Sequence, residues 1–240
     1  MILPFSDEEE KIYVANLAKV NEELQQLYDI EGSDKMQILK MLTRLRQLCL
    51  EPRLVYDNID QPSSKLKACM ELIKTMQENK QKVLLFSSFT SALDLIAEEC
   101  QKAGITYYML TGSTNKEERR ELVSRFQKDD TTLFLISLKA GGTGLNLTSA
   151  ENVIHYDPWW NVSAQNQATD RAYRIGQKSN VQVFNLVMKD SVEEKIIEMQ
   201  KRKKELADMF VENNSGGLSQ MSKEDIFKFY YNVKDGNAFF

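Results

Sequence analysis

The sequence is poor in the residues from which metal and disulfide sites are built. Its 240 residues include only three cysteines and one histidine. The cysteines, at positions 49, 69 and 100, are widely spaced and lie in helical patterns. We therefore expect reduced core residues of an intracellular protein rather than disulfides. With one histidine and no close pair of cysteines, the sequence lacks the ligands of a typical zinc site.

Long apolar runs and nucleotide-binding signatures are also missing. The longest apolar runs, such as VLLF and LFLI, have the length of β-strands, so we expect no segment to span a membrane. The N-terminal MILPFSDEEE lacks the basic region and apolar stretch of a secretory signal. No P-loop ending GK[ST] occurs, and no Asp-Glu pair ends an apolar strand to hold magnesium. The sequence therefore lacks the main machinery for holding a nucleoside triphosphate by itself.

The charge of the chain is small but unevenly distributed. The composition, 42% hydrophobic and 28% charged, indicates one large folded domain or a domain with an extension. The net charge is -4, and residues 1–31 contribute -6 through eight acidic and two basic side chains, which leaves +2 for residues 32–240. This balance permits a local phosphate-binding face without requiring one.

The first sixty residues predict helices. Ser6 and Glu9 have the spacing of a capping box. An apolar stripe with helical spacing follows at Tyr13, Leu17, Val20, Leu24 and Leu27. A second helix should begin near residue 34 and must end before Pro52. The polar, proline-containing stretch YDNIDQPSSK then indicates a boundary before the main domain.

From residue 61 onward, strands and helices alternate. Strands are expected at 82–87, 106–110, 132–137, 152–156 and 181–187, and helices at 64–79, 91–103, 115–128 and 162–174. Short apolar strands separated by amphipathic helices predict an α/β fold, in which helices cover both faces of a parallel sheet. Further capping boxes are expected at Thr114 with Glu117 and at Ser191 with Glu194. His155 falls in a buried strand, so we expect a core histidine rather than a catalytic base.

The pattern divides the chain into three parts. Residues 1–60 form a helical extension that leads into the main domain, and residues 61–190 form the α/β core. Residues 191–240 begin with a long charged helix, continue through NNSGG and end in a short helix. We expect this C-terminal extension to pack back on the core or on a partner of the core.

Four loops are candidates for function, because ligands of open α/β sheets bind beyond the carboxyl ends of the strands: SSFT, TGST, SLKAGGTGLNL and DPWWN. SLKAGGTGLNL (137–147) has glycines that let the backbone approach an anion, unless it is an ordinary tight turn. DPWWN (157–161) should turn Trp159 inward and leave Trp160 exposed, unless both rings brace the loop. In QATDRAYRIGQ, Arg171 and Arg174 share one helical face and can hold one anion. Alternatively, Arg171 pairs with carboxylates.

These segments together resemble a known family. KVLLFSSFTSALDLI, LTGSTNKEERRELVSRF, LISLKAGGTGLNLTSAENVIHYDPWWN and QATDRAYRIGQ are similar, in order and spacing, to the C-terminal motifs of Swi/Snf-type ATPases, the DNA-translocating branch of helicase superfamily two. The resemblance covers roughly residues 36–210, and LTRLRQLCLEP resembles the helix before this lobe. It implies a RecA-like C-terminal lobe that closes on an N-terminal lobe of the same polypeptide across a bound ATP.

The resemblance also implies roles for individual residues. Arg171 and Arg174 match the arginine fingers that neutralise charge on the transferred phosphoryl group. Residues that match nucleotide-binding positions are Gly142, Gly144, Asn146 and Gln167. Residues that match DNA-binding positions are Thr111, Gly112, Ser113, Lys139 and Trp160. The chain departs from the family pattern at Val162, Gln165, Asn166 and Tyr173, which we expect to tune coupling between the lobes.

The resemblance finally implies cofactors and partners. ATP is expected, with Mg²⁺ and the Walker lysine held by the N-terminal lobe, which this sequence does not contain. The chain alone should therefore be inactive. Double-stranded DNA is the expected nucleic acid, with no membrane involved, in the cytoplasm or nucleoid of a bacterium or the nucleus of a eukaryote. Two alternatives remain open: an RNA helicase lobe, and a non-catalytic interaction module with a RecA-like fold.

Overall fold

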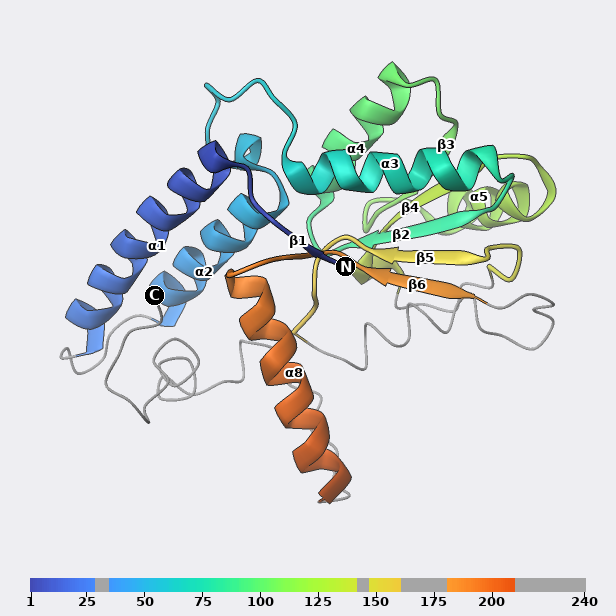
Figure 1. Ribbon diagram of the computed structural model, residues 1–240. Helices are drawn as coiled ribbons and strands as arrows, with labels where there is room; N and C mark the ends of the chain where they lie inside the picture. Colours follow the sequence, from blue (N-terminus) through green and yellow to red (C-terminus); the bar gives the residue numbers. More distant parts are fainter. Residues whose placement is uncertain (29–34, 142–146, 161–180, 210–240) are drawn as a thin grey trace.

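The core of the protein is a five-stranded parallel sheet with the strand order β3-β4-β2-β5-β6 (Figure 1). The computed structural model describes residues 1–28, 35–141, 147–160 and 181–209. The strands are β2 (Val83–Ser87), β3 (Tyr107–Leu110), β4 (Leu133–Ser137), β5 (Asn152–His155) and β6 (Gln182–Asn185). The predicted α/β fold with a parallel sheet is confirmed. The segment expected as one strand at 181–187 is divided into β6 and β7 (Val187–Met188).

Helices cover both faces of the sheet because β2 and β4 carry unbroken apolar runs, VLLF and LFLI. Side chains alternate between the two faces along a strand. Val83 and Leu85 pack with α3 (Ser64–Glu78) and α4 (Thr90–Lys102), whereas Leu84 and Phe86 pack with Phe126 of α5 (Lys116–Lys128). The predicted helices at 64–79, 91–103 and 115–128 are confirmed to within one residue at each end. The predicted helix at 162–174 and the segment after residue 209 lie outside the described residues.

Two long helices form a pair beside the sheet, seen in blue in Figure 1. They are α1 (Asp7–Tyr28) and α2 (Lys35–Leu50), and a 3-10 turn, η1 (Pro52–Leu54), follows α2. The predicted stripe of α1 is buried at Tyr13, Leu17, Val20 and Leu24, while the side chain of Leu27 is not among those described. This stripe shares a core with Met188 and with Val192 of α8 (Val192–Met209). The N-terminal and C-terminal helices therefore stabilise each other.

The first residues of the chain add a strand that the sequence pattern did not predict. β1 (Ile2–Leu3) pairs in parallel with β7, so that Ile2 lies opposite Val187. The terminal ammonium group donates to the carbonyl oxygen of Asn185 at 2.7 Å. Two residues are too short for a periodic signal, and their pairing depends on a strand far along the chain. No helix in the described part of the chain is long and apolar enough to cross a membrane.

The three predicted capping boxes had different outcomes. The box of Ser6 and Glu9 is confirmed, because the backbone N–H of Ser6 donates to Oε2 of Glu9 at 2.8 Å and that of Glu9 donates to Oγ of Ser6 at 3.4 Å. The box of Thr114 and Glu117 was wrong, since α5 begins one residue later. Its cap is Asn115, which accepts the N–H groups of Glu117 and Glu118.

The box expected at Ser191 is offset by one residue. Oγ of Ser191 accepts the N–H of Glu193 at 3.1 Å, but Glu194 reaches the N–H of Asp190, at 2.7 Å, instead of that of Ser191. Asp190 has a φ of 52°, a left-handed conformation that aspartate tolerates better than most residues. This kink before α8 explains the offset.

Candidate functional site

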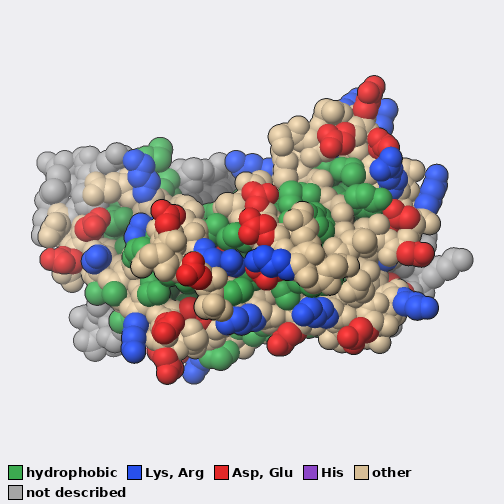
Figure 2. All heavy atoms as spheres, turned by 90° about the horizontal axis from the view of Figure 1, so that it is seen from above, with side chains coloured by type: hydrophobic (Ala, Val, Ile, Leu, Met, Phe, Trp, Pro, Cys, Tyr) green, Lys and Arg blue, Asp and Glu red, His purple; other side chains and the backbone are tan. Residues whose placement is uncertain are grey.

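Four loops that carry the predicted motifs leave the sheet at one edge. They follow β3, β4, β2 and β5, and these strands are neighbours in that order. Because the strands are parallel, the four loops emerge side by side at what we call the carboxyl edge. Figure 2 looks onto the molecule from above Figure 1 and shows basic and acidic side chains interspersed among the described residues of that face. No large field of one sign gathers on the face seen from above in Figure 2 among the described residues.

The loop after β3 presents hydroxyl groups and an open stretch of backbone. Oγ1 of Thr111 and Oγ of Ser113 lie 2.8 Å apart, and Ser113 and Gly112 are exposed. A Cβ added at Gly112 would meet no heavy atom within 4 Å. No packing contact among the described residues therefore requires glycine here, whereas close approach by a ligand would favour it. The predicted DNA-binding positions 111–113 thus form one accessible group.

The loop after β4 adds a cation next to this group. Lys139 is exposed on the short helix α6 (Leu138–Gly141). Leu110 at the end of β3 lies opposite Ile136 near the end of β4, so the two loops leave the sheet side by side. Arg119 of α5 donates through Nη1 to the carbonyl oxygen of Ala140 at 3.2 Å, which ties α6 to α5. Hydroxyls, backbone N–H groups and an ammonium group are suited to phosphates and carry no base identity.

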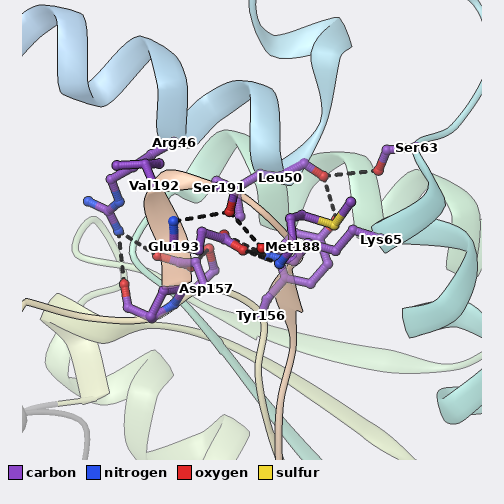
Figure 3. Close-up of polar contacts among 12 residues, drawn as sticks. Arg46, Leu50, Ser63, Lys65, Tyr156, Asp157, Met188, Ser191, Val192 and Glu193 are labelled. Atoms are coloured by element: carbon purple, nitrogen blue, oxygen red, sulfur yellow. Dashed lines mark hydrogen bonds and ion pairs between the residues drawn. The ribbon is translucent and has the colours of Figure 1, made fainter. Parts of the chain in front are cut away.

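Asp157 joins the loops after β2 and β5, a role that sequence reasoning missed. Its Oδ1 accepts from Oγ of Ser87 at 2.7 Å and from the N–H of Ser88 at 3.0 Å. Its Oδ2 accepts from the hydroxyl of Ser88 and from Nη2 of Arg46, the latter at 2.9 Å. Figure 3 shows Arg46 and Asp157 of this arrangement, which lie between α2 and the sheet. The sequence signals were an aspartate directly after a buried strand and an arginine within the apolar repeat of α2.

The prediction for the two tryptophans was wrong in its assignment of inside and outside. Trp160 is only 6% exposed, and Trp159 is partly buried against the cluster that includes Leu84 and Phe134. The regular alternation of a strand ends at His155, so it does not extend through Pro158. The guanidinium carbon of Arg46 lies 5.7 Å from the centroid of the Trp160 ring. An indole buried in this way is not presented to a duplex, and the alternative in which both rings brace the loop fits better.

His155 is a core residue, as expected. It is 1% exposed, and its ring stacks on that of Phe86 at a centroid distance of 5.7 Å. Burial lowers the pKa of His155 from 6.5 to about 4, with a smaller opposing effect from the charge of Asp157. The imidazole is therefore neutral near pH 7.

The remaining predicted site residues lie outside the described residues. They are Gly142, Gly144 and Asn146 of the glycine loop, and Gln167, Arg171 and Arg174, together with the departures at 162, 165, 166 and 173. Their placement rests on the sequence. In the described part of the chain, no three His, Cys, Asp or Glu side chains gather into a group that could hold a metal ion.

Comparisons with known proteins agree with this arrangement of motifs. Residues 64–176 match the family described as the helicase conserved C-terminal domain. A putative ATP-dependent helicase/translocase of Bacillus subtilis is 37% identical over 234 residues, which cover 94% of this chain and 25% of that protein.

Solved structures agree as well. The C-terminal domain of the Sulfolobus solfataricus SWI2/SNF2 ATPase is 26% identical, with a TM-score of 0.75 and coverage of 95% of each chain. The core of that ATPase in complex with dsDNA is 29% identical, with a TM-score of 0.75, and covers 95% of this chain and 49% of that chain. The chain spans between 20% and 25% of the length of three curated relatives that it matches.

Proposed function

The chain belongs to the SWI2/SNF2 family of ATP-dependent helicases, as a C-terminal RecA-like lobe, and on this basis we propose that it serves an ATP-driven translocase of double-stranded DNA. The observation that carries the proposal is the group of phosphate-type donors at the carboxyl edge. The accessible residues there come directly after the neighbouring strands β3 and β4. They are Thr111, Gly112, Ser113 and Lys139. Directly beyond Lys139 the chain continues into the glycine loop. One edge of the sheet would thus contact both the DNA backbone and the nucleotide.

The nucleotide is proposed to bind between this lobe and the N-terminal lobe. Gly142, Gly144, Asn146 and Gln167 would contact ATP, and Arg171 and Arg174 would neutralise charge on its γ-phosphate. The described residues offer no acidic cluster for a divalent cation. In the proposal, Mg²⁺ is therefore held by the N-terminal lobe.

The DNA contacts are proposed to be independent of sequence. Donors that reach only phosphate oxygens fix the register of a protein on DNA but do not read bases. Closing and reopening of the two lobes around ATP would alternate the grip on the backbone and move the protein along the duplex. This proposal places the protein in the compartment that holds DNA, the nucleoid or the nucleus.

The division of the chain is part of the proposal. Residues 61–190 would be the lobe that turns over nucleotide with its partner, and residues 1–60 and 191–240 would brace it. The shared core of α1, α2 and the start of α8 supports this, because side chains of the two extensions pack together in one hydrophobic cluster.

The test is ATP hydrolysis by the complete enzyme, which joins this chain to its N-terminal lobe. Double-stranded DNA should stimulate hydrolysis, and the enzyme should displace the third strand of a triplex as it moves. The chain alone should show no turnover above background. Stronger stimulation by RNA would favour an RNA helicase. Absence of hydrolysis with every nucleic acid would favour a non-catalytic interaction module.

A further inference from the structure

We propose that Arg46 is a positioning residue for the loop Asp157–Trp160. Arg46 comes from α2 of the helical extension, whereas the loop follows β5 of the sheet. The chain leaves this loop directly into the segment that contains Arg171 and Arg174. The effect of Arg46 on catalysis rests on the proposed function. The role of Arg46 in placing the loop does not depend on that function.

The guanidinium of Arg46 holds two loops at once. Its Nη2 atom lies 2.9 Å from Oγ of Ser88, 2.9 Å from Oδ2 of Asp157 and 3.2 Å from the carbonyl oxygen of Pro158. Ser88 follows β2, and the other two follow β5, at a sequence distance of 111 and 112 residues from Arg46. Charged hydrogen bonds of this kind are stronger than neutral ones. The loops after β2 and β5 are therefore fastened to α2 through one side chain.

The guanidinium also lies over two aromatic rings. Its central carbon is 4.9 Å from the ring centroid of Phe89 and 5.7 Å from that of Trp160. A planar, delocalised cation can stack on both rings while its edge donates to the three acceptors, a geometry that a lysine ammonium does not reproduce. The buried ring of Trp160 thus lies against a charged group from α2.

The arrangement does more than the packing of the helix requires. Arg46 is 7% exposed, and its Nε atom is buried with no hydrogen-bond partner among the described residues. An unpaired buried donor costs free energy that an apolar side chain at this position of α2 would avoid. Asp157 would keep its bonds to Ser87 and Ser88 if Arg46 were replaced. Loss of Arg46 should therefore loosen the loop without unfolding the sheet.

The chain contains two tryptophans, Trp159 and Trp160, so its tryptophan fluorescence reports on this loop alone. In Arg46→Lys the charge is kept but the stacking is lost. We expect emission to shift to the red and acrylamide quenching to increase about twofold or more, with thermal unfolding still cooperative. The matched control is Arg44→Lys on the same helix, because Arg44 contacts Asn16 and Tyr56 instead of the loops. The control should leave the fluorescence unchanged.

In the complete enzyme, Arg46→Lys should lower kcat of DNA-stimulated ATP hydrolysis by about 10- to 100-fold, as misplacement of a catalytic segment does. The KM for ATP should change little, and Arg44→Lys should behave as the wild type. Unchanged fluorescence and quenching in Arg46→Lys would overturn the proposal. Altered fluorescence with a normal kcat would contradict an effect of Arg46 on catalysis and leave only its role in placing the loop. If the wild-type enzyme does not respond to DNA, the proposed function fails, and the fluorescence still decides the role of Arg46.

Should Arg46→Lys fail to fold, Asp157→Asn weakens the same pair from its other side. Increased quenching in Asp157→Asn would support the proposal. Wild-type quenching in a folded Asp157→Asn protein would contradict it.

Discussion

Nζ of Lys65 lies 2.6 Å and 2.7 Å from the two carboxylate oxygens of Glu193, although the residues are 128 positions apart in the sequence (Figure 3). Both side chains are buried, with 0% and 1% exposed. The ammonium group also lies 5.4 Å from the ring centroid of Tyr156, and Oε2 of Glu193 accepts the N–H of Met188 at 2.8 Å. This pair joins the first turn of α3 to the first turn of α8. It therefore links the sheet domain to the C-terminal helix.

Removal of one partner of this pair should strongly destabilise the fold. Burial raises the pKa of Glu193 even though Lys65 opposes the shift, so the carboxylate depends on its cation. Lys65→Met should lower the free energy of unfolding by about 3–5 kcal/mol, since it leaves an uncompensated buried charge. The double variant Lys65→Met/Glu193→Leu should recover much of this loss. Urea unfolding of the wild type, the single variants Lys65→Met and Glu193→Leu, and the double variant measures the coupling, and a cost below about 1 kcal/mol for Lys65→Met would contradict a role for the pair.

The only histidine of the chain should make stability depend on pH below neutrality. The pKa of His155 is lowered from 6.5 to about 4 by burial, so the unfolded chain binds a proton between these values while the folded protein does not. The stabilising effect is complete above pH 6.5 and is lost as the pH falls toward 4. Between pH 7 and 5 we expect a loss of about 2 kcal/mol.

The measurement for His155 is urea unfolding at pH 7, 6 and 5, with His155→Asn as control. The variant lacks the titrating group, so its pH dependence should be flatter by that amount. Parallel curves for the two proteins would show that His155 does not titrate as burial predicts.

Lys139 should contribute one phosphate contact. In the complete enzyme, Lys139→Ala should reduce the slope of log affinity for duplex DNA against log salt concentration by about 0.9. Fluorescence anisotropy of a labelled duplex over a series of salt concentrations provides the slope. Lys102→Ala is a suitable control, because Lys102 is exposed at the end of α4 and pairs with Glu99 at 2.8 Å. An identical slope for Lys139→Ala and the wild type would remove Lys139 from the DNA contacts.

Substitution of Gly112 by alanine should weaken DNA binding without weakening the fold. Its surroundings have room for a methyl group, so Gly112→Ala should not destabilise the fold and should raise stability slightly by restricting the unfolded chain. If a phosphate approaches the backbone at this point, the same methyl group should weaken binding by about tenfold, the effect of about 1.4 kcal/mol. Thermal unfolding and DNA affinity are measured side by side. Normal affinity for DNA would show that the duplex passes elsewhere.

Arg174 should matter for turnover in the complete enzyme. Arg174→Ala should reduce kcat by on the order of 10³-fold, the low end for an arginine finger, and leave the thermal midpoint nearly unchanged. Arg174→Lys retains a positive charge but not the bidentate geometry, and should recover only part of the rate. A collapse of thermal stability with normal activity per folded molecule would instead assign Arg174 a structural role.

The sequence by itself determined the elements of the core and the loops that carry the motifs. Short apolar runs such as VLLF predict buried strands because every position must face a helix, and the five core strands were found within two residues of their predicted ends. The stripe from Tyr13 to Leu24 predicted the buried face of α1, because apolar residues at helical spacing lie on one side of a helix. Parallel strands also placed Thr111–Ser113 and Lys139 at a common edge.

Only the tertiary structure decided which distant side chains meet. Periodicity describes one element at a time, so it could not pair Arg46 with Asp157 or Lys65 with Glu193, which lie 111 and 128 residues apart. It also could not pair β1 with β7. The inward position of Trp160 has the same origin. Strand alternation ends before Pro158, and beyond that point the Trp160 ring lies near the guanidinium of Arg46 from α2.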